Sequence, residues 1–190
     1  MSTLLGKLLK FWQKQAAPLL ENAPRLLVSV AALEFISRSS SQSPNFETGG
    51  ILIGHHSGSD IIVRKATDAG PNAKRSQCGF LRDRSHCQKI LEQEFAVSGA
   101  DYVGEWHTHV IDLPRPSSGD LQTLAGIILD PDYDFPSFCM ILAVVGGESP
   151  RIAGYVVTAY SCTRRPARKT VKVVETELTR LEKDADSRAL

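Results

Sequence analysis

The chain has 190 residues, of which 42% are hydrophobic and 23% charged, as in an ordinary globular domain. Its 22 basic and 21 acidic residues give a formal net charge of +1, which argues against a nucleic-acid or polyanion binder. The length suffices for a core without disulfides or structural metal, and the composition excludes collagen-like, disordered, disulfide-scaffold and multi-pass membrane proteins. The sequence therefore predicts one folded domain with short extensions.

Residues 1–23 contain an amphipathic pattern. Apolar residues recur at helical spacing, while Lys7, Lys10 and Lys14 share one face. The apolar runs are too short to span a bilayer, and the lysines interrupt any signal-peptide core. We expect a helix that covers one flank of the domain, with docking to a partner or a membrane surface as the alternative.

Residues 24–162 mix strands and helices without the regular alternation of a doubly wound sheet. A mixed, largely antiparallel sheet flanked by helices fits better, which makes the expected fold class α+β, an α/β sandwich in one domain. The expected elements are a strand at 25–30, a helix at 31–39, a hairpin of 49–54 with 61–63, a polar segment at 70–79, a helix at about 82–97, a strand at 102–109, a helix from about 118, and strands at 138–145 and 152–160.

Residues 163–190 separate charge by sign. Basic residues cluster between Arg164 and Lys172, and acidic residues dominate from Glu175 onward. The net charge of +1 is therefore an average over two blocks. We expect a charged, solvated terminal helix or extension and no nucleic-acid partner, because the basic cluster is small.

The cysteines do not form a metal-binding or disulfide pattern. They contain no CxxC pair, and the sequence shows no secretory signal. We therefore expect reduced thiols and a cytoplasmic location. The four are Cys78, Cys87, Cys139 and Cys162.

Residues that carry chemistry concentrate between Gly104 and Asp120. His107 and His109 are two positions apart on a predicted strand, so both imidazoles point to the same side. Two such histidines are often only polar surface residues, so the case for a metal site depends on a third ligand. Asp120 follows a proline-containing loop in the first turn of a helix, where its carboxylate can fold back over the strand end. Two histidines, one carboxylate and an open fourth position are typical of catalytic zinc.

The same residues also have simpler interpretations. Ser117 or Ser118 is a good helix N-cap, and Asp120 in the first turn complements the helix dipole. Capping and metal binding are compatible, because a cap fixes the carboxylate that a metal needs. Asp112 is a rival ligand, but its spacing from His109 puts it on the wrong register.

The pattern of His107, one residue, His109, seven residues, Ser117, two residues and Asp120 resembles the signature of the JAB/MPN metalloproteases, the JAMM family. Two other zinc patterns do not match: for the metallo-β-lactamase H-x-H-x-D-H, Asp112 is misplaced and no histidine follows it, and the deaminase H-x-E with P-C-x-x-C is absent. The resemblance covers most of the chain. We therefore expect a JAB/MPN metalloprotease domain at 24–162.

Two further features agree with this family, and one departs from it. Glu47, just before Gly49-Gly50, matches the family's upstream glutamate, and Trp106 matches an aromatic residue that often precedes the histidines. Val110 stands where many members have a proline. We expect this departure to alter the stiffness of the loop more than the chemistry.

The resemblance implies zinc-assisted amide hydrolysis with one Zn²⁺ per chain. His107, His109 and Asp120 would hold the zinc, whose bound water becomes acidic enough to react near neutral pH. Glu47 would take a proton from that water and return it to the leaving amine. Ser117 would donate a hydrogen bond to the oxyanion.

Intact members of the family mostly cleave peptide or isopeptide bonds after the C-terminus of ubiquitin or ubiquitin-like proteins. The segments 70–73 and 80–83 resemble a bacterial branch from ubiquitin-like conjugation operons, some of them antiviral. This implies a ubiquitin-like protein and its conjugates as partners, and adenylating (E1-like) and conjugating (E2-like) enzymes as further candidates. The alternatives are a catalytically silent MPN scaffold, or a zinc amidohydrolase acting on a small molecule or another peptide.

Overall fold

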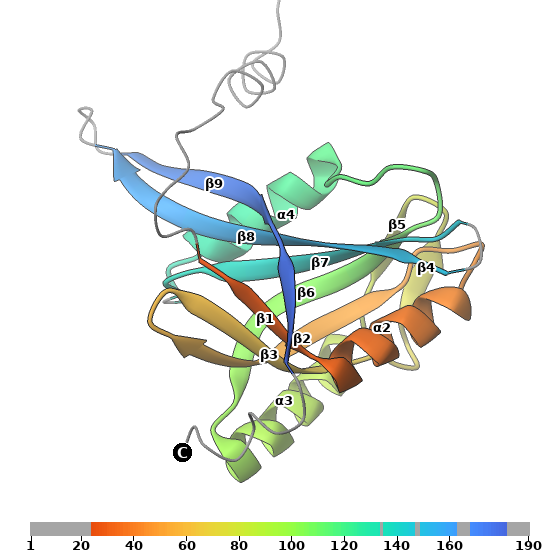
Figure 1. Ribbon diagram of the computed structural model, residues 1–190, viewed down its shortest axis with the longest axis horizontal. Coiled ribbons are helices and arrows are strands. Elements are labelled where there is room, and N and C mark those ends of the chain that lie inside the picture. The colour runs from red at the N-terminus through yellow and green to blue at the C-terminus, as the bar shows by residue number, and fades with distance from the viewer. Residues whose placement is uncertain (1–23, 134, 147–148, 163–167, 182–190) are drawn as a thin grey trace, which may run out of the picture.

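The computed structural model describes residues 24–133, 135–146, 149–162 and 168–181 (Figure 1). The helix predicted within residues 1–23 lies outside these ranges. The described elements, in chain order, are β1 (Leu26–Ser29), α2 (Val30–Ser41), β2 (Gly49–Ser57), β3 (Asp60–Ala66), β4 (Lys74–Ser76), β5 (Gly79–Leu81), α3 (Arg84–Ser98), β6 (Asp101–His109), α4 (Ser118–Leu129), β7 (Phe138–Val144), β8 (Arg151–Cys162), β9 (Arg168–Thr176) and β10 (Leu178–Leu181).

Eight of these strands form one mixed sheet in the order β10-β1-β3-β2-β6-β7-β8-β9, and β4 and β5 form a separate hairpin. The β10–β1, β1–β3 and β6–β7 pairs are parallel, and the other four pairs are antiparallel. The predicted α+β fold with a mixed, largely antiparallel sheet is confirmed. Within the described ranges, no helix is long and apolar enough to cross a membrane.

The sheet has an apolar layer on each face. On one face, Trp106 and Ile141 pack with α2, and on the other, Met140 and Leu142 pack with α3 and α4. Figure 1 shows α4 beside β8 and β9, and α3 near the other side of the molecule. Because successive side chains of a strand point to opposite faces and Trp106 is on the α2 face, the next residue, His107, is on the face that carries α3 and α4.

Polar caps set where the helices begin. The Ser29 hydroxyl accepts a hydrogen bond from Ala32 N and starts α2, and the Asp83 carboxylate accepts one from His86 N and starts α3. The sequence predicted the start of α3 near Arg82, two residues early, because the cap at Asp83 was not recognised. Helix α3 ends at Gly99, whose φ of +67° suits glycine.

The prediction for the C-terminal segment was wrong in its secondary structure. The described part of it, 168–181, forms β9 and β10 in the main sheet instead of a helix or a solvated extension. Val171 and Val173 are two positions apart and pack against the α4 side of the core. This period of two indicates a strand, but the prediction followed the charges and missed it. The boundary at 162/163 stays a prediction.

Strand β10 brings the two ends of the sheet together. Only Glu177 separates β9 from β10, yet these strands stand at opposite ends of the strand order, so the sheet must curl. Leu178 lies in the resulting contact. A Cβ atom placed on Gly154 of β8 would be 2.7 Å from Leu178 Cδ2 and 2.9 Å from Leu26 Cδ2.

Candidate metal centre

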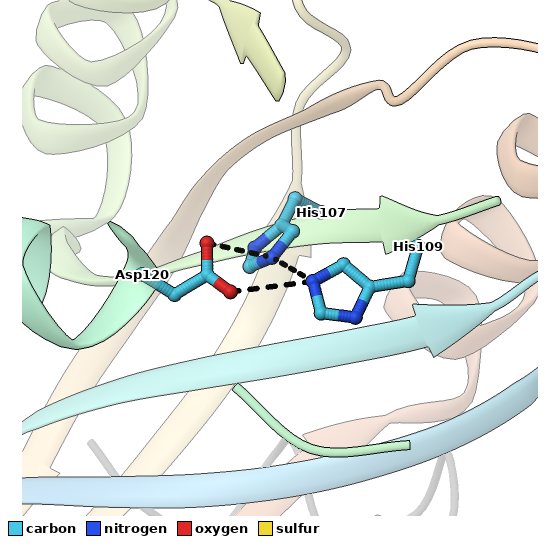
Figure 2. A group of neighbouring side chains, drawn as sticks. All are labelled: His107, His109 and Asp120. Carbon is cyan, nitrogen blue, oxygen red and sulfur yellow. Dashed lines mark hydrogen bonds and ion pairs between the residues drawn. The ribbon is translucent and has the colours of Figure 1, made fainter. Parts of the chain in front are cut away.

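Strand β6 and the first turn of α4 bring three potential metal ligands together. The Nε2 atoms of His107 and His109 are 3.3 Å apart. Oδ1 of Asp120 lies 3.3 Å from His107 Nε2, and Oδ2 lies 3.2 Å from His109 Nε2. Figure 2 shows both rings and the carboxylate pointing toward one another. Among the described residues these three form the one group of His, Cys, Asp and Glu side chains that is suited to a metal ion.

The spacing of these atoms fits a tetrahedral zinc ion. Bonds of about 2.0–2.1 Å in tetrahedral geometry separate the ligand atoms by about 3.3–3.4 Å. The 3.3 Å separation of the two Nε2 atoms is close to that length, and the carboxylate places a different oxygen near each ring, Oδ1 at 3.3 Å from His107 Nε2 and Oδ2 at 3.2 Å from His109 Nε2. Two imidazole nitrogens and a carboxylate are also the donor set of catalytic zinc sites, which leave one position open.

Hydrogen bonds outside the group fix two of the ligands. Nδ1 of His109 lies 2.8 Å from the Leu113 carbonyl oxygen, which only accepts. Nδ1 therefore carries a hydrogen, and Nε2 faces Asp120. The Ser117 hydroxyl accepts from Asp120 N, and Asp120 Oδ2 accepts from Ser117 N at 2.7 Å, which is a capping box. The predicted N-cap at Ser117 is confirmed.

The electrostatics of the group favour a cation between the ligands. Burial alone would raise the pKa of Asp120, but its hydrogen bonds to the histidines and Ser117 lower the pKa well below its usual range. Burial alone would lower the pKa of His109, but Asp120 and the Leu113 carbonyl raise it. A proton is one cation that these groups stabilise, and a metal ion competes with it for the same nitrogen.

Glu47 lies beside the histidines. Thr48 and Thr108 join the two segments through two hydrogen bonds, Thr108 N to Thr48 O at 2.8 Å and Thr48 N to Thr108 Oγ1 at 2.9 Å. Burial raises the pKa of the Glu47 carboxyl, while the nearby histidines lower it. A buried carboxylate with a raised pKa is a suitable proton acceptor at neutral pH.

The two glycines after Thr48 permit this close approach. A Cβ on Gly49 would be 2.2 Å from the Trp106 carbonyl oxygen and 2.5 Å from Phe80 Cζ, and one on Gly50 would be 2.1 Å from the Thr67 carbonyl oxygen. No side chain fits at these distances. Gly49 therefore permits the close contact of β2 with β6 and with the β4–β5 hairpin, and Gly50 permits the close contact with Thr67, just after β3.

The hairpin was not predicted, because its residues read as a polar segment. Its anchors reach residues next to the metal ligands: Glu47 N donates to Ser76 O at 2.7 Å, and Arg75 Nε donates to Thr48 Oγ1 at 3.1 Å. The Phe80 ring lies 6.4 Å from the His107 ring. Of the residues that form these contacts, the sequence indicated Glu47 and His107 as site residues but none of the hairpin residues.

Asp112 does not join the ligand group. Its side chain is 79% exposed and forms an ion pair with Arg151 of β8. Asp112 lies beyond the end of β6 at His109, so it is this exposed position in the loop, and not the register of the strand, that keeps it out of the group. The thiols also lie apart from the group: Cys78 is exposed, and Cys87 and Cys139 are buried, and all three are free.

A groove of about 940 Å³ lies on the same face of the sheet, between α3 and α4. Thr123, one turn after Asp120, lines it, as do Leu91 of α3 and Ile127 of α4. Tyr133, which is 46% exposed, and Phe135 add aromatic surface at its rim. None of the three potential ligands lines this groove: Asp101 and Tyr102 belong to the start of β6, and Asp130 and Tyr133 follow the end of α4, whereas His107, His109 and Asp120 lie at the other ends of these elements.

The fold and the His-His-Asp group, together with the names of similar proteins, define the chain as a metallopeptidase of the JAMM type. Residues 29–162 match the family described as prokaryotic homologs of the JAB domain. The chain belongs to this family.

Similar proteins include the probable metalloprotease y4qB of Sinorhizobium fredii, 31% identical over 131 residues, which are 66% of this chain and 80% of that protein. A CD-NTase/cGAS isopeptidase of Escherichia coli is 28% identical over 124 residues, 64% of this chain and 75% of that protein. The solution structure of protein DSY2949 from Desulfitobacterium hafniense has a TM-score of 0.55 at 17% identity, covering 83% of this chain and 94% of that one. This last similarity concerns the fold alone.

Proposed function

We propose that the protein is a zinc-dependent isopeptidase or peptidase that cleaves after the C-terminus of a ubiquitin-like modifier. The observation that carries the proposal is the convergence of His107, His109 and Asp120 into a group that could hold a metal ion, with Glu47 buried beside them. A silent scaffold has no need for a complete ligand set, so we favour an active enzyme.

His107, His109 and Asp120 would hold the ion. Zinc held there would lower the pKa of a water molecule to about 7 and would polarise the scissile carbonyl. The capping box and the Leu113 carbonyl keep Asp120 and His109 in their orientations before the substrate arrives.

Glu47 would act as the general base and then the general acid. Its carboxylate accepts the proton of the attacking water, and its raised pKa helps it return that proton to the leaving amine. The hydrogen bonds between Thr48 and Thr108 hold Glu47 beside the histidines, because Thr48 follows Glu47 in sequence and Thr108 lies between His107 and His109.

Ser117 would stabilise the negative charge that develops on the substrate carbonyl oxygen. Its hydroxyl stands at the N-terminus of α4, where the first-turn N–H groups of the helix also favour an anion. Donors that are held in place before the reaction contribute about 10²–10³ in rate.

The groove between α3 and α4 supports a folded protein as part of the substrate. It lies on the same face of the sheet as the potential ligands and is lined in part by half-buried apolar side chains, including Leu91 and Ile127. We propose that the modifier's globular part docks there while its C-terminal tail extends toward the metal ligands beside the β4–β5 hairpin. A target such as the CD-NTase named for several relatives is a candidate conjugate.

The surroundings of the enzyme are part of the same proposal. We propose a cytoplasmic enzyme whose domain spans 24–162, with 1–23 and 163–190 as extensions. E1-like and E2-like enzymes of a neighbouring, antiviral conjugation operon would supply its conjugates.

The first experiment replaces the base and measures the metal separately. In Glu47→Gln we expect cleavage of a ubiquitin-like fusion to fall by about 10²–10⁴-fold, while the protein still binds one zinc ion per chain. The matched control is Glu34→Gln on the exposed side of α2, which should keep the wild-type rate. Unchanged cleavage in Glu47→Gln, or full activity after removal of metal with a chelator, would disprove the proposed mechanism.

A second experiment separates the substrate classes. The enzyme is incubated with three substrates: a fusion to the ubiquitin-like protein encoded nearby, the same modifier conjugated to a CD-NTase, and small acetylated amides. The proposal expects cleavage of the first two directly after the modifier. Hydrolysis of the small amides without cleavage of either protein would instead identify a small-molecule amidohydrolase.

A further inference from the structure

The loop between β6 and α4 connects the strand that carries His107 and His109 to the helix that carries Asp120. Two side chains of β8, which itself carries no potential ligand, contact this loop. Arg151 of β8 forms an ion pair with Asp112. Four residues later on the same strand, the Tyr155 hydroxyl donates to the Pro114 carbonyl oxygen at 2.9 Å. Leu113 lies between these two anchored residues.

The position of Leu113 matters because its carbonyl oxygen sets the state of His109. The 2.8 Å contact requires the hydrogen of the neutral ring to be on Nδ1, which leaves the Nε2 lone pair directed at the ligand group. If this carbonyl turned away, the hydrogen would distribute between both nitrogens, and the ring would lose its preferred orientation.

The two anchors differ in strength. The side chains of Arg151 and Asp112 are 61% and 79% exposed, and ion pairs in that setting contribute little. Tyr155 is only 4% exposed and its hydrogen bond to the Pro114 carbonyl is part-buried, so it is less accessible to water than the ion pair. Burial raises the pKa of Tyr155 to about 12, so that its hydroxyl remains a donor at every pH at which the enzyme would work.

The proline completes the restraint. A residue that precedes proline is confined to extended backbone conformations, so Leu113 has few alternatives once Pro114 is held. Tyr155 therefore restrains the Leu113 carbonyl through the next residue along the chain, 41 positions before the tyrosine in sequence.

We propose that Tyr155 is a positioning residue for the metal site, which holds the Leu113 carbonyl where it fixes the Nδ1–H tautomer of His109. The inference rests on the proposed function for its consequence, since only a metal site needs a free Nε2. Partners of this kind typically change metal affinity by 10–100-fold.

The test uses the full chain with ¹⁵N-labelled histidine and reads the tautomer by NMR in the chelator-treated protein at a pH where His109 is neutral. We expect Nδ1–H in the wild type and a mixture of tautomers in Tyr155→Phe. In a zinc competition titration, the same variant should bind about 10-fold more weakly. Arg151→Gln, which removes the exposed anchor of the same loop, should change neither result by more than about twofold.

Each outcome decides one question. An unchanged tautomer in a folded Tyr155→Phe overturns the inference, even when its thermal midpoint falls, because a purely structural hydroxyl would lower stability alone. If that variant does not fold, Pro114→Ala serves instead, since it frees the Leu113 backbone and should produce the same mixture. Absence of zinc binding by the wild type would refute the proposed function, while the tautomer still tests the hydrogen-bond chain.

Discussion

Ser117 combines a structural and a proposed chemical task in one hydroxyl group, and substitution can separate them. In Ser117→Ala we expect the free energy of unfolding to fall by about 1 kcal/mol from the lost cap, and kcat to fall by about 10²–10³ from the lost oxyanion donor. Ser29, the N-cap of α2, offers a matched control. Ser29→Ala should lose similar stability, measured by urea unfolding, but keep kcat; an equal loss of kcat in both variants would contradict the role of Ser117.

Asp83 gives the fold a defined sensitivity to acid. Hydrogen bonds from the Ser85 hydroxyl, His86 N and Asn72 lower its pKa to about 2, below the ordinary value of 3.8. A lowered native pKa contributes stability above the unfolded pKa, and this contribution is lost as the pH falls from about 4 to about 2.

Asp83→Asn keeps a capping oxygen but does not titrate. We expect its urea midpoint to lie below that of the wild type at pH 6 and to approach it near pH 2. Asp112→Asn, at an exposed position, should shift little at either pH. A gap between wild type and Asp83→Asn that stays constant with pH would show that the charge of Asp83 contributes nothing.

At the scale of residues, the sequence predicted that His107, His109 and Asp120 would converge because the pattern is local, and their role as ligands stays a prediction. His107 and His109 are two apart on a strand, and Asp120 follows in the next helix, so period and spacing suffice. Tyr155 gave no such signal, since its contact with Pro114 depends on the pairing of β7 with β8. Only the assembled sheet shows which side chains support the ligands.

At the scale of elements, the approach of β2 to β6 depends on a single glycine. In Gly49→Ala the new Cβ would meet the Trp106 carbonyl oxygen at 2.2 Å, so the strands must separate next to Glu47. We expect a loss of roughly 1–3 kcal/mol in the free energy of unfolding and a larger relative loss of kcat than of zinc affinity. Thermal unfolding, zinc titration and steady-state kinetics measure the three quantities.

Gly126 of α4 is the matched control for this change. A Cβ there meets nothing within 4 Å, and alanine favours a helix by about 1 kcal/mol over glycine. Gly126→Ala should therefore be as stable as the wild type or more so. If Gly49→Ala also unfolded and reacted like the wild type, the close packing of β2 on β6 would have no role in placing Glu47.

Most elements could be predicted because their hydrophobic patterns are clear, as in β7, a short continuous apolar run in which every residue is buried. The β4–β5 hairpin and β9 could not, for opposite physical reasons. The hairpin is short, and its strands are largely exposed, so it carries no periodic apolar signal. In β9 the valines have the period of a strand, but the charged residues around them dominate the composition.

At the scale of the whole molecule, β10 should contribute more stability than its four residues suggest. Leu178 packs against the core beside Leu26 and Gly154, where the sheet curls on itself. We expect Leu178→Ala to lower the free energy of unfolding by roughly 1–3 kcal/mol. Thr179→Ala, at the exposed neighbouring position, should change it by less than about 0.5 kcal/mol; equal effects in thermal or urea unfolding would argue against a role for the curl.

The parallel pairing of β1 with β10 also has a consequence for how the chain is made. Leu26 pairs with Leu178, so one edge of the first described strand stays unpaired until the ribosome has synthesised about 150 further residues. Contacts this distant in sequence slow folding, because a long loop must close before they form. During synthesis the nascent chain would hold an open strand edge, a site at which chaperones bind or neighbouring chains aggregate. Completion of the sheet is thus coupled to the emergence of β10 from the ribosome.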